Sequence, residues 1–596
     1  MPFVRNLVAL SLLASAAPIV ARDCPVPTAE EGGPVNRHTR YLETHMLPAV
    51  IGPDTRPSTL SERMRAFGVP GVSVAVVHKG RIAWARGWGV RDVDTCRPVN
   101  AATAFQAASI SKAVTAMVAL RMVEAGRIGL DDDINRSLSS WHLPADRTLA
   151  PNGVTLRQLL SHTAGLGVHG FSGYLPGAEI PTAVEVLNGL APANTPAVRN
   201  VLPAGGQWQY SGGGYVVAQT ALGDVSKRAF ADLAEQEVLK PLGMRRSGYA
   251  QPPPPRLWAN AASGHSAGRV IPGRYHVYPE LAPAGLWTTA HDLAAFLIDV
   301  QKAAAGRTGN RLSPGMARTM LTEVKGNWGL GPALYGEGTG RRFGHDGVNE
   351  GFQSIMVAYA ARGDGIVVLT NGDQGRRLAD EIVRAVATDY GWTELAAPAT
   401  VELRLSPEQI AKIAGRYEGN GLSVYLDARD DGLFAQTGGP RPERLVAISP
   451  LRFRTDASGM LVEFSPGYAR FRILEGGPPI EFARIDAKAR SAAAVYLRGS
   501  MNDWSTSILF QRQKDGSLTA DAAVESGELQ FKIGSADWRE VDFGSSDGAL
   551  AKVGGSAAAL VPHGGNVRVA IQRPGRYRFT VRMDNEKAAL TIRQAE

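Results

Sequence analysis

Hydrophobic patterning in the first two thirds of the chain predicts strands near both ends of one long region, with helices between them. Apolar and β-branched residues fill residues 71–77 and 81–88, and Lys79-Gly80 between them favours a β-hairpin. Residues 352–359 and 365–370 also have the composition of strands, and a helical pattern of apolar residues follows them. We therefore expect one sheet that is assembled from segments far apart in the sequence.

Apolar residues that recur at helical spacing from Ile110 onward predict a helix, which Gly126 can end. Ser109 and Lys112 have the S-x-x-K spacing, so both side chains lie on one face of this helix, one turn apart. A serine needs a neighbouring base to act as a nucleophile at neutral pH, and a helix N-terminus favours the developing negative charge. The spacing alone is weak evidence, because a chain of this composition contains about one such match by chance.

The last third of the chain has the patterning of two small β-rich modules. After a linker at Ala396–Pro398, the segment Ser406–Gln409 predicts the start of a short helix by its capping residues. Short strands separated by Gly, Asp and Pro turns then run from about residue 415 to 482, which predicts an all-β domain. A second linker, Ala487–Ala494, leads into a final β-rich stretch that ends near Ile592.

The N-terminus has the layout of a secretory signal peptide. Arg5 precedes an apolar stretch, Leu7–Ala14, which is followed by the small residues Ala14–Ala17. We expect residues 1–21 to be removed and the mature protein to be exported, to the periplasm or the medium. The sequence has no later run of about 20 apolar residues, so we expect no permanent membrane anchor.

The length and charge of the chain bear on its domain number and its binding partners. A length of 596 residues exceeds what one hydrophobic core usually supports, so several domains are expected. The net charge of +8 comes from Lys and Arg scattered among Asp and Glu without a basic run, which argues against nucleic-acid binding.

Cys24 and Cys96 are the only cysteines, and the sequence leaves open whether they pair. In an oxidising compartment two cysteines more often form a disulfide than a metal site. Arg22 and Asp23 stand where a lipidated cysteine would have small residues, so a lipoprotein is disfavoured. Clustered His, Cys, Asp and Glu spacings typical of a metal site are missing from the sequence, and we expect neither a metal nor another cofactor.

Four further motifs follow Ser109 and Lys112 in order. They are Leu160-Ser161-His162-Thr163-Ala164-Gly165-Leu166, Tyr210-Ser211-Gly212, Pro283-Ala284-Gly285-Leu286 and His345-Asp346-Gly347. With this set the chain, over about residues 40–392, resembles the serine β-lactamase-like hydrolases, which include class C β-lactamases, D-alanyl-D-alanine carboxypeptidases, D-aminopeptidases and related esterases. The resemblance implies an α+β fold with a β-lactamase/transpeptidase-like antiparallel sheet and helices.

The resemblance also implies a role for each motif residue. Ser109 would attack an acyl carbonyl, and Tyr210 would act with Lys112 as general base and then as general acid. Lys112 would hold Tyr210 in its reactive ionisation state. His345-Asp346-Gly347 would be the H-x-G form of the family's K-T-G element, which binds substrate on the strand beside the cleft. The backbone N–H groups of Ser109 and Val348 would form the oxyanion hole.

Two departures from the family pattern bear on the substrate. Gly212, at a position expected to contact substrate, stands where the family usually has asparagine, and His345 stands where β-lactamases typically have lysine. Both favour hydrolysis of an ester or a D-amino-acid amide or peptide. The alternatives are a β-lactamase or penicillin-binding D-alanyl-D-alanine carboxypeptidase and, in another class, a carbohydrate-binding protein with a decayed hydrolase domain. We expect His162 and Thr163 to be structural rather than catalytic.

Each C-terminal module also carries a resemblance. The segment Ala414–Gly419 is similar to the first residues of the small β-barrel often appended to this family. Such a barrel either shapes the mouth of the active site or only stabilises the protein. Segments 495–504, 531–538 and 574–579 resemble the immunoglobulin-like accessory modules of pullulanases and glycogen-binding domains. That resemblance makes Trp504 and Trp538 candidates for sugar contact, although strand tryptophans are more often part of a core.

Together these observations predict a chain of four parts. They are a signal peptide at 1–21, a β-lactamase-like serine hydrolase domain at 22–395, a small all-β barrel at 400–486 and an immunoglobulin-like β-sandwich at 493–596. The expected partners are a small-molecule or peptide substrate and, through the last module, a polysaccharide.

Overall fold

The structure is a computed structural model that divides into two compact units, Met1–Leu47 with Arg56–Ala396 and Pro48–Thr55 with Ala397–Glu596. It describes Cys24, Gly33 and residues 35–50, 56–146, 148–396, 402–419, 422–429, 432–436, 442–456, 459–474, 479–485, 495–502, 504, 507–513, 515–535, 538, 541–545, 550–562, 564–584 and 587–595. The predicted signal peptide and the linker at Ala487–Ala494 lie outside the described residues, as does the linker at Ala396–Pro398 apart from Ala396.

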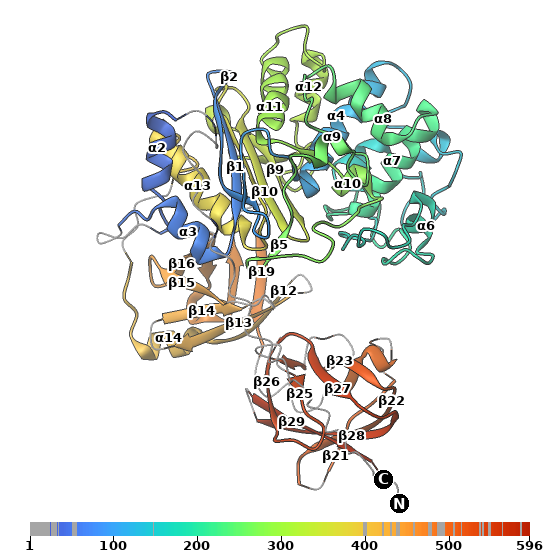
Figure 1. The fold of residues 1–596 in the computed structure, drawn as a ribbon, viewed down its shortest axis with the longest axis vertical. Coiled ribbons are helices and arrows are strands. Elements are labelled where there is room, and N and C mark those ends of the chain that lie inside the picture. Colours follow the sequence, from blue (N-terminus) through green and yellow to red (C-terminus); the bar gives the residue numbers. More distant parts are fainter. Residues whose placement is uncertain are drawn as a thin grey trace, which may run out of the picture. The chain divides into compact units, whose positions relative to one another are not determined.

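A seven-stranded antiparallel sheet forms the centre of the first unit (Figure 1). Its strands, in spatial order, are β3 (Arg97–Pro98), β2 (Arg81–Asp92), β1 (Gly71–His78), β11 (Gly365–Thr370), β10 (Phe352–Tyr359), β9 (Arg342–Asn349) and β8 (Ala333–Tyr335). The predicted hairpin and the assembly of one sheet from distant segments are both confirmed. Lys79 and Gly80, both with positive φ, form the turn between β1 and β2.

Helices cover both faces of this sheet (Figure 1). Val72, Val74 and Val76 of β1 point into a core with α2 (Arg37–Thr44), α3 (Leu60–Phe67) and α13 (Gly375–Tyr390). Ala75 and Val77 point to the opposite core, as the alternation of a strand requires. The helices of that second side are α4 (Ser111–Glu124), α5 (Leu156–Leu160), α6 (Ala183–Asn188), α7 (Gly212–Ser226), α8 (Phe230–Ala234), α9 (Pro255–Trp258), α10 (Leu281–Ala284), α11 (Ala290–Ala304) and α12 (Pro314–Met320).

Short connections and a disulfide complete the first unit. β4 (Phe105–Gln106) pairs with β7 (Trp287–Thr288), and β5 (His265–Ser266) pairs with β6 (Arg269–Val270). Cys24 and Cys96 form a disulfide with 5.3 Å between their Cα atoms, which answers the question that the sequence left open. In the described part of the chain, no helix has the length and apolar composition needed to cross a bilayer.

The second unit contains a closed eight-stranded barrel, which confirms the predicted small all-β barrel. It is preceded by α14 (Pro407–Ile413), where Ser406 and Gln409 form the predicted capping box. The barrel strands are β12 (Gly415–Gly419), β13 (Leu422–Arg429), β14 (Gly432–Gln436), β15 (Glu443–Ala447), β16 (Arg452–Thr455), β17 (Leu461–Phe464), β18 (Arg470–Ile473) and β19 (Ile480–Arg484).

The last strands form a ten-stranded sheet around a core of their own. They are β20 (Tyr496–Gly499), β21 (Gln511–Arg512), β22 (Leu518–Val524), β23 (Gly527–Gly534), β24 (Asp542–Ser545), β25 (Leu550–Ala551), β26 (Ala558–Pro562), β27 (Val567–Ile571), β28 (Gly575–Asp584) and β29 (Lys587–Gln594). Hydrogen bonding joins these strands into one sheet, and the prediction of an immunoglobulin-like sandwich stays a prediction.

Candidate active site

Ser109 lies in a 3₁₀ turn, η1 (Ala108–Ile110), immediately before α4. The turn is fixed by Ser111, whose Oγ accepts a hydrogen bond from the Leu286 N–H at 3.0 Å and donates one to the Ala108 carbonyl. The Leu286 carbonyl in turn accepts a hydrogen bond from the Ala107 N–H at 2.8 Å. The motif Pro283–Leu286 therefore holds the backbone on both sides of Ser109.

Lys112 is in direct contact with Ser109. Its Nζ atom lies 2.9 Å from Ser109 Oγ and donates a hydrogen bond to the Pro283 carbonyl at 3.0 Å. The side chain is only 2% exposed, and this burial lowers the pKa of Lys112 to about 7, although Asp346 opposes the shift. A substantial fraction of Lys112 is therefore neutral at physiological pH and able to accept a proton.

Tyr210 directly precedes Ser211, the N-cap of α7, and its ring lies 4.9 Å from Lys112 Nζ. Burial raises the pKa of Tyr210 far above its usual value, against a hydrogen bond with Ser109 that lowers it. Tyr210 is therefore a neutral phenol in the free protein. The structure brings Ser109, Lys112 and Tyr210 together as the motif order implied.

Strand β9 passes alongside the nucleophile turn and carries the H-x-G element. A Cβ atom at Gly347 would lie 2.2 Å from the Ala107 carbonyl oxygen, so only glycine permits this approach. Burial, helped by the charge of Lys112, lowers the pKa of His345, which is consequently neutral at pH 7. Its Nδ1 atom contacts the Asp346 carbonyl at 2.5 Å, and Nε2 has no hydrogen-bond partner among the described residues.

Asp346 and Val348 face away from the interior of the protein, because side chains alternate along β9. The Asp346 carboxylate is 50% exposed and forms an ion pair with Arg376, near the start of α13. Burial alone would raise the pKa of Asp346, but Arg376 lowers it, so the carboxylate is ionised. The Val348 side chain is 61% exposed, and its backbone lies one residue beyond Gly347, on the strand that borders Ser109.

Gly212 has no room for a side chain. A Cβ atom there would lie 2.7 Å from Cε2 of Phe171 and 3.0 Å from the His169 carbonyl oxygen, which also accepts the Gly212 N–H. The space beside the position where the family usually has asparagine is therefore taken by Phe171.

Sequence reasoning missed most of the aromatic surroundings of Tyr210. The ring centroid of His169 lies 4.9 Å from that of Tyr210, and the centroid of Trp328 lies 5.8 Å from it. Trp328 also packs against His345, with a centroid separation of 5.4 Å. His169 and Trp328 lie in loops outside the motifs and far from residue 210 in the sequence, so no local pattern marks them.

A buried carboxyl group also escaped sequence reasoning. Glu280 caps α10, next to the segment that binds Lys112, and is fully buried. Neither carboxyl oxygen has a hydrogen-bond partner in another described residue. Burial raises the pKa of Glu280 to about 7, although a hydrogen bond from its own backbone N–H lowers it.

Trp504 and Trp538 lie side by side in the last module. Their ring centroids are 6.3 Å apart, and both side chains are half-buried. The Arg498 guanidinium stacks on Trp538 at 4.0 Å from its centroid. Arg498 therefore covers one face of the Trp538 ring.

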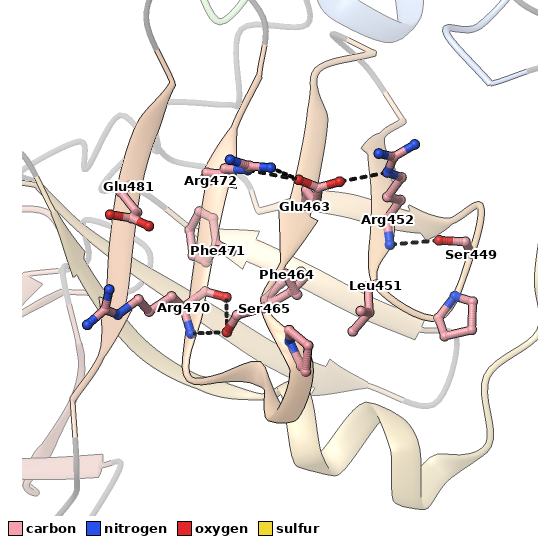
Figure 2. A pocket seen from close by; sticks show the side chains of 12 residues that line it. Ser449, Leu451, Arg452, Glu463, Phe464, Ser465, Arg470, Phe471, Arg472 and Glu481 are labelled. Carbon is pink, nitrogen blue, oxygen red and sulfur yellow. Dashed lines mark hydrogen bonds and ion pairs between the residues drawn. The ribbon is translucent and has the colours of Figure 1, made fainter.

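The barrel carries a separate cavity of about 690 Å³, shown in Figure 2. Its most prominent feature is Glu463, which accepts hydrogen bonds from both Arg452 and Arg472 at 2.8 Å. The Glu463 carboxylate thus pairs with an arginine on each neighbouring strand, and among the described residues that line the cavity no nucleophile is paired with a base. The pairing of a nucleophile with a base is instead found at Ser109 and Lys112.

Comparison with known proteins agrees with this geometry. A model of the family described as Beta-lactamase matches residues 58–389. Esterase EstB of Burkholderia gladioli is 29% identical over 214 residues, which are 34% of this chain and 52% of the esterase. The putative penicillin-binding protein PbpX of Bacillus subtilis is 23% identical over 330 residues, or 54% of this chain and 74% of PbpX. Protein flp of Staphylococcus aureus is 23% identical, over 51% of this chain and 60% of flp.

The chain thus spans only about half the length of the esterase and three fifths of flp. Among solved structures, the octameric penicillin-binding protein homologue from Pyrococcus abyssi aligns with 71% of this chain and 98% of its own, at 20% identity and a TM-score of 0.49. The family match to residues 58–389 covers more than half of the 596 residues and contains every motif around Ser109, and the chain accordingly belongs to the beta-lactamase family.

Proposed function

We propose that this chain is an exported serine hydrolase that cleaves an ester or a D-amino-acid amide bond through an acyl-enzyme on Ser109. The observation that carries the proposal is the buried Lys112, 2.9 Å from Ser109 Oγ and with a pKa of about 7. A neutral amine can accept the Ser109 proton while it still donates to the Pro283 carbonyl.

The proposed reaction uses three side chains and returns each to its starting state. The Ser109 proton moves to Lys112 as Oγ bonds to the acyl carbon, and the backbone N–H groups of Ser109 and Val348 stabilise the oxyanion. The leaving group then departs with the proton of Tyr210, which is replaced by the proton on Lys112. Water attacks the acyl-enzyme with Lys112 as base, the bond to Oγ breaks, and the proton returns to Ser109.

The walls of the site favour esters over β-lactams. The neutral His345 offers no fixed cation for a β-lactam carboxylate. Phe171 occupies the space beside Gly212, where the family usually has asparagine. The similarity to an esterase points the same way. A decayed hydrolase domain is disfavoured, because the Ser109–Lys112 contact and its supports are intact.

Export is part of the proposal. The Cys24–Cys96 disulfide supports it, because such bonds form and persist in oxidising compartments. Fractionation of cells that express the full chain should recover a protein shortened at its N-terminus from the periplasm or medium. Recovery of full-length protein from the cytoplasm would exclude export.

The function is tested by hydrolysis of p-nitrophenyl butyrate and of a chromogenic cephalosporin by the mature protein and by Ser109→Ala. We expect ester turnover that is lost in Ser109→Ala and negligible cephalosporin turnover. Rapid cephalosporin turnover would instead favour the β-lactamase alternative. If neither substrate reacts with folded protein, D-amino-acid amides are the next test, and inactivity towards them as well would favour the carbohydrate-binding alternative.

We also propose that the last module, as an immunoglobulin-like sandwich, binds a glucan or an envelope polysaccharide. The adjacent Trp504 and Trp538 rings, each half-buried, favour this second function. Affinity electrophoresis of the full chain in gels with starch, glycogen or peptidoglycan should show retardation that Trp538→Ala weakens. Unchanged mobility of the wild-type protein in all three gels would refute sugar binding.

A further inference from the structure

His162 binds the backbone on both sides of Tyr210. Its carbonyl oxygen accepts a hydrogen bond from the Gln209 N–H at 2.8 Å. Its Nδ1 atom accepts a second one from the Ser211 N–H at 3.1 Å. Gln209 and Ser211 are the neighbours of Tyr210 in the chain, so one residue from a distant segment fixes the backbone before and after the tyrosine.

The His162 side chain also contacts the tyrosine ring itself. The two ring centroids are 4.3 Å apart and the rings are tilted by 32°. His162 is 1% exposed and adopts a left-handed backbone conformation, with φ of 59°. Few residues other than glycine occupy this conformation, which indicates that the surrounding structure holds His162 in place.

The hydrogen bond to Ser211 fixes the charge state of the imidazole. An Nδ1 atom that accepts from an N–H group carries no proton, so His162 is neutral with its proton on Nε2. If Nδ1 were protonated, its N–H group would face the Ser211 N–H group, and neither could accept the other's hydrogen bond. Burial and the nearby charge of Lys112 agree with this state, because both lower the pKa of His162.

We propose that His162 is a positioning residue that holds Tyr210 against Ser109 and the leaving group. The inference rests on the proposed function of Tyr210 and adds a role for the Leu160–Leu166 motif. A small displacement of a proton donor lowers the rate of the chemical step more than it changes substrate binding. Loss of His162 should therefore lower kcat and leave KM nearly unchanged.

The test compares His162→Asn and His162→Leu, alone and combined with Tyr210→Phe, by kcat and KM for ethyl butyrate, whose alkoxide leaving group requires a proton donor. Asparagine keeps an acceptor for the Ser211 N–H and tolerates the left-handed backbone, whereas leucine removes the acceptor. We expect kcat to fall about 100-fold in His162→Leu and less in His162→Asn, with KM within about twofold. In the Tyr210→Phe background, His162→Leu should cause no further loss, because residues that act as a unit are not additive.

Ser161→Ala is the matched control. Ser161 is fully buried on the same turn, and its hydroxyl bonds to Arg157 and Thr163 rather than to the tyrosine turn. It should lose thermal stability without a change in kcat. Losses that multiply in the His162/Tyr210 double variant would overturn the inference. Full activity of Tyr210→Phe would instead contradict the role of Tyr210 in the proposed function.

A measurement on the wild-type protein covers the case in which the leucine variant does not fold. Nitrogen-15 NMR with labelled histidine should show one histidine that stays in the neutral Nε2–H form between pH 5 and 9, and this signal should be missing from His162→Asn. If that signal reports an Nδ1–H tautomer or an imidazolium ion, the inference is wrong.

Discussion

Lys112 Nζ lies 2.9 Å from Ser109 Oγ, and the environment of Lys112 makes this contact chemically productive. Burial lowers the pKa of Lys112 to about 7, and only the neutral amine can accept a proton. We therefore expect kcat/KM for a neutral ester to rise between pH 5 and 9 with an apparent pKa near 7, as measured by initial rates across this range.

Lys112→Arg is the informative variant for this profile. An arginine stays protonated across the whole range, so the rate at pH 9 should fall by about 100- to 10,000-fold. The loss should be smaller at pH 5, where wild-type Lys112 is itself protonated, and the inflection near pH 7 should disappear. A rate in the wild-type protein that does not change from pH 5 to 9 would argue against Lys112 as the base.

Asp346 should determine whether the site accepts charged substrates. Its half-exposed carboxylate lies on the strand that borders Ser109 and acts electrostatically on Lys112 and Tyr210. We expect the wild-type protein to prefer phenyl acetate over 4-acetoxybenzoate, and Asp346→Asn to raise the relative kcat/KM of the carboxylate substrate about tenfold. The apparent pKa of the pH profile should also move down, because Asp346 raises the pKa of Lys112.

Asp380→Asn is the matched control for this specificity. Asp380 bonds to the same guanidinium of Arg376 at 3.1 Å, but it lies on α13 and not on β9. If both variants change the substrate ratio equally, the effect belongs to Arg376 rather than to the charge of Asp346.

The parts of this site that sequence could predict are local ones. Ser109 in η1 and Lys112 in α4 are three residues apart in consecutive helical turns, so their spacing determines their contact. The β1–β2 hairpin is likewise encoded by its own turn residues. The order of the remaining motifs pointed to Tyr210 and His345 through family resemblance. The structure adds that Tyr210 is a neutral phenol, a state set by burial that spacing does not encode.

The parts that sequence could not predict depend on contacts between distant segments. The 2.7 Å approach of Phe171 to a Cβ at Gly212 joins two segments that share no pattern. The pairing of Arg376 with Asp346 likewise joins a helix to a strand 30 residues away, and neither residue has an unusual neighbourhood in the sequence. Such contacts follow from tertiary packing. The sequence therefore shows that residue 212 is not an asparagine, but it does not show that Phe171 fills the space beside it.

Gly212 offers a test of this packing. In Gly212→Ala the new methyl group would meet Phe171 and the His169 carbonyl, so the free energy of unfolding should fall by about 1–3 kcal/mol. Thermal or denaturant unfolding of the hydrolase unit measures the change. Adding Phe171→Ala should recover part of the loss, whereas purely additive losses would show that Phe171 is not the obstacle.

Glu280 predicts an unusual pH dependence of stability. The carboxyl group has an ordinary pKa of 4.5 and, buried without a partner in another described residue, a pKa of about 7 in the folded protein. Between these values the folded state binds more protons than the unfolded state, so the free energy of unfolding falls as pH rises. The favourable contribution is complete below about pH 4.5 and is lost by about pH 7, and it amounts to about 3 kcal/mol at most.

Glu280→Gln should remove this contribution, because an amide does not titrate. Unfolding of the variant and the wild-type protein is compared at intervals from pH 4.5 to 7.5, and the difference between them should change in favour of the variant as pH rises. Asp299→Asn is a suitable comparison, since burial also raises the pKa of that carboxyl group but Arg311 donates a hydrogen bond to it. A constant difference between Glu280→Gln and wild type across the range would mean that Glu280 does not change its protonation on unfolding.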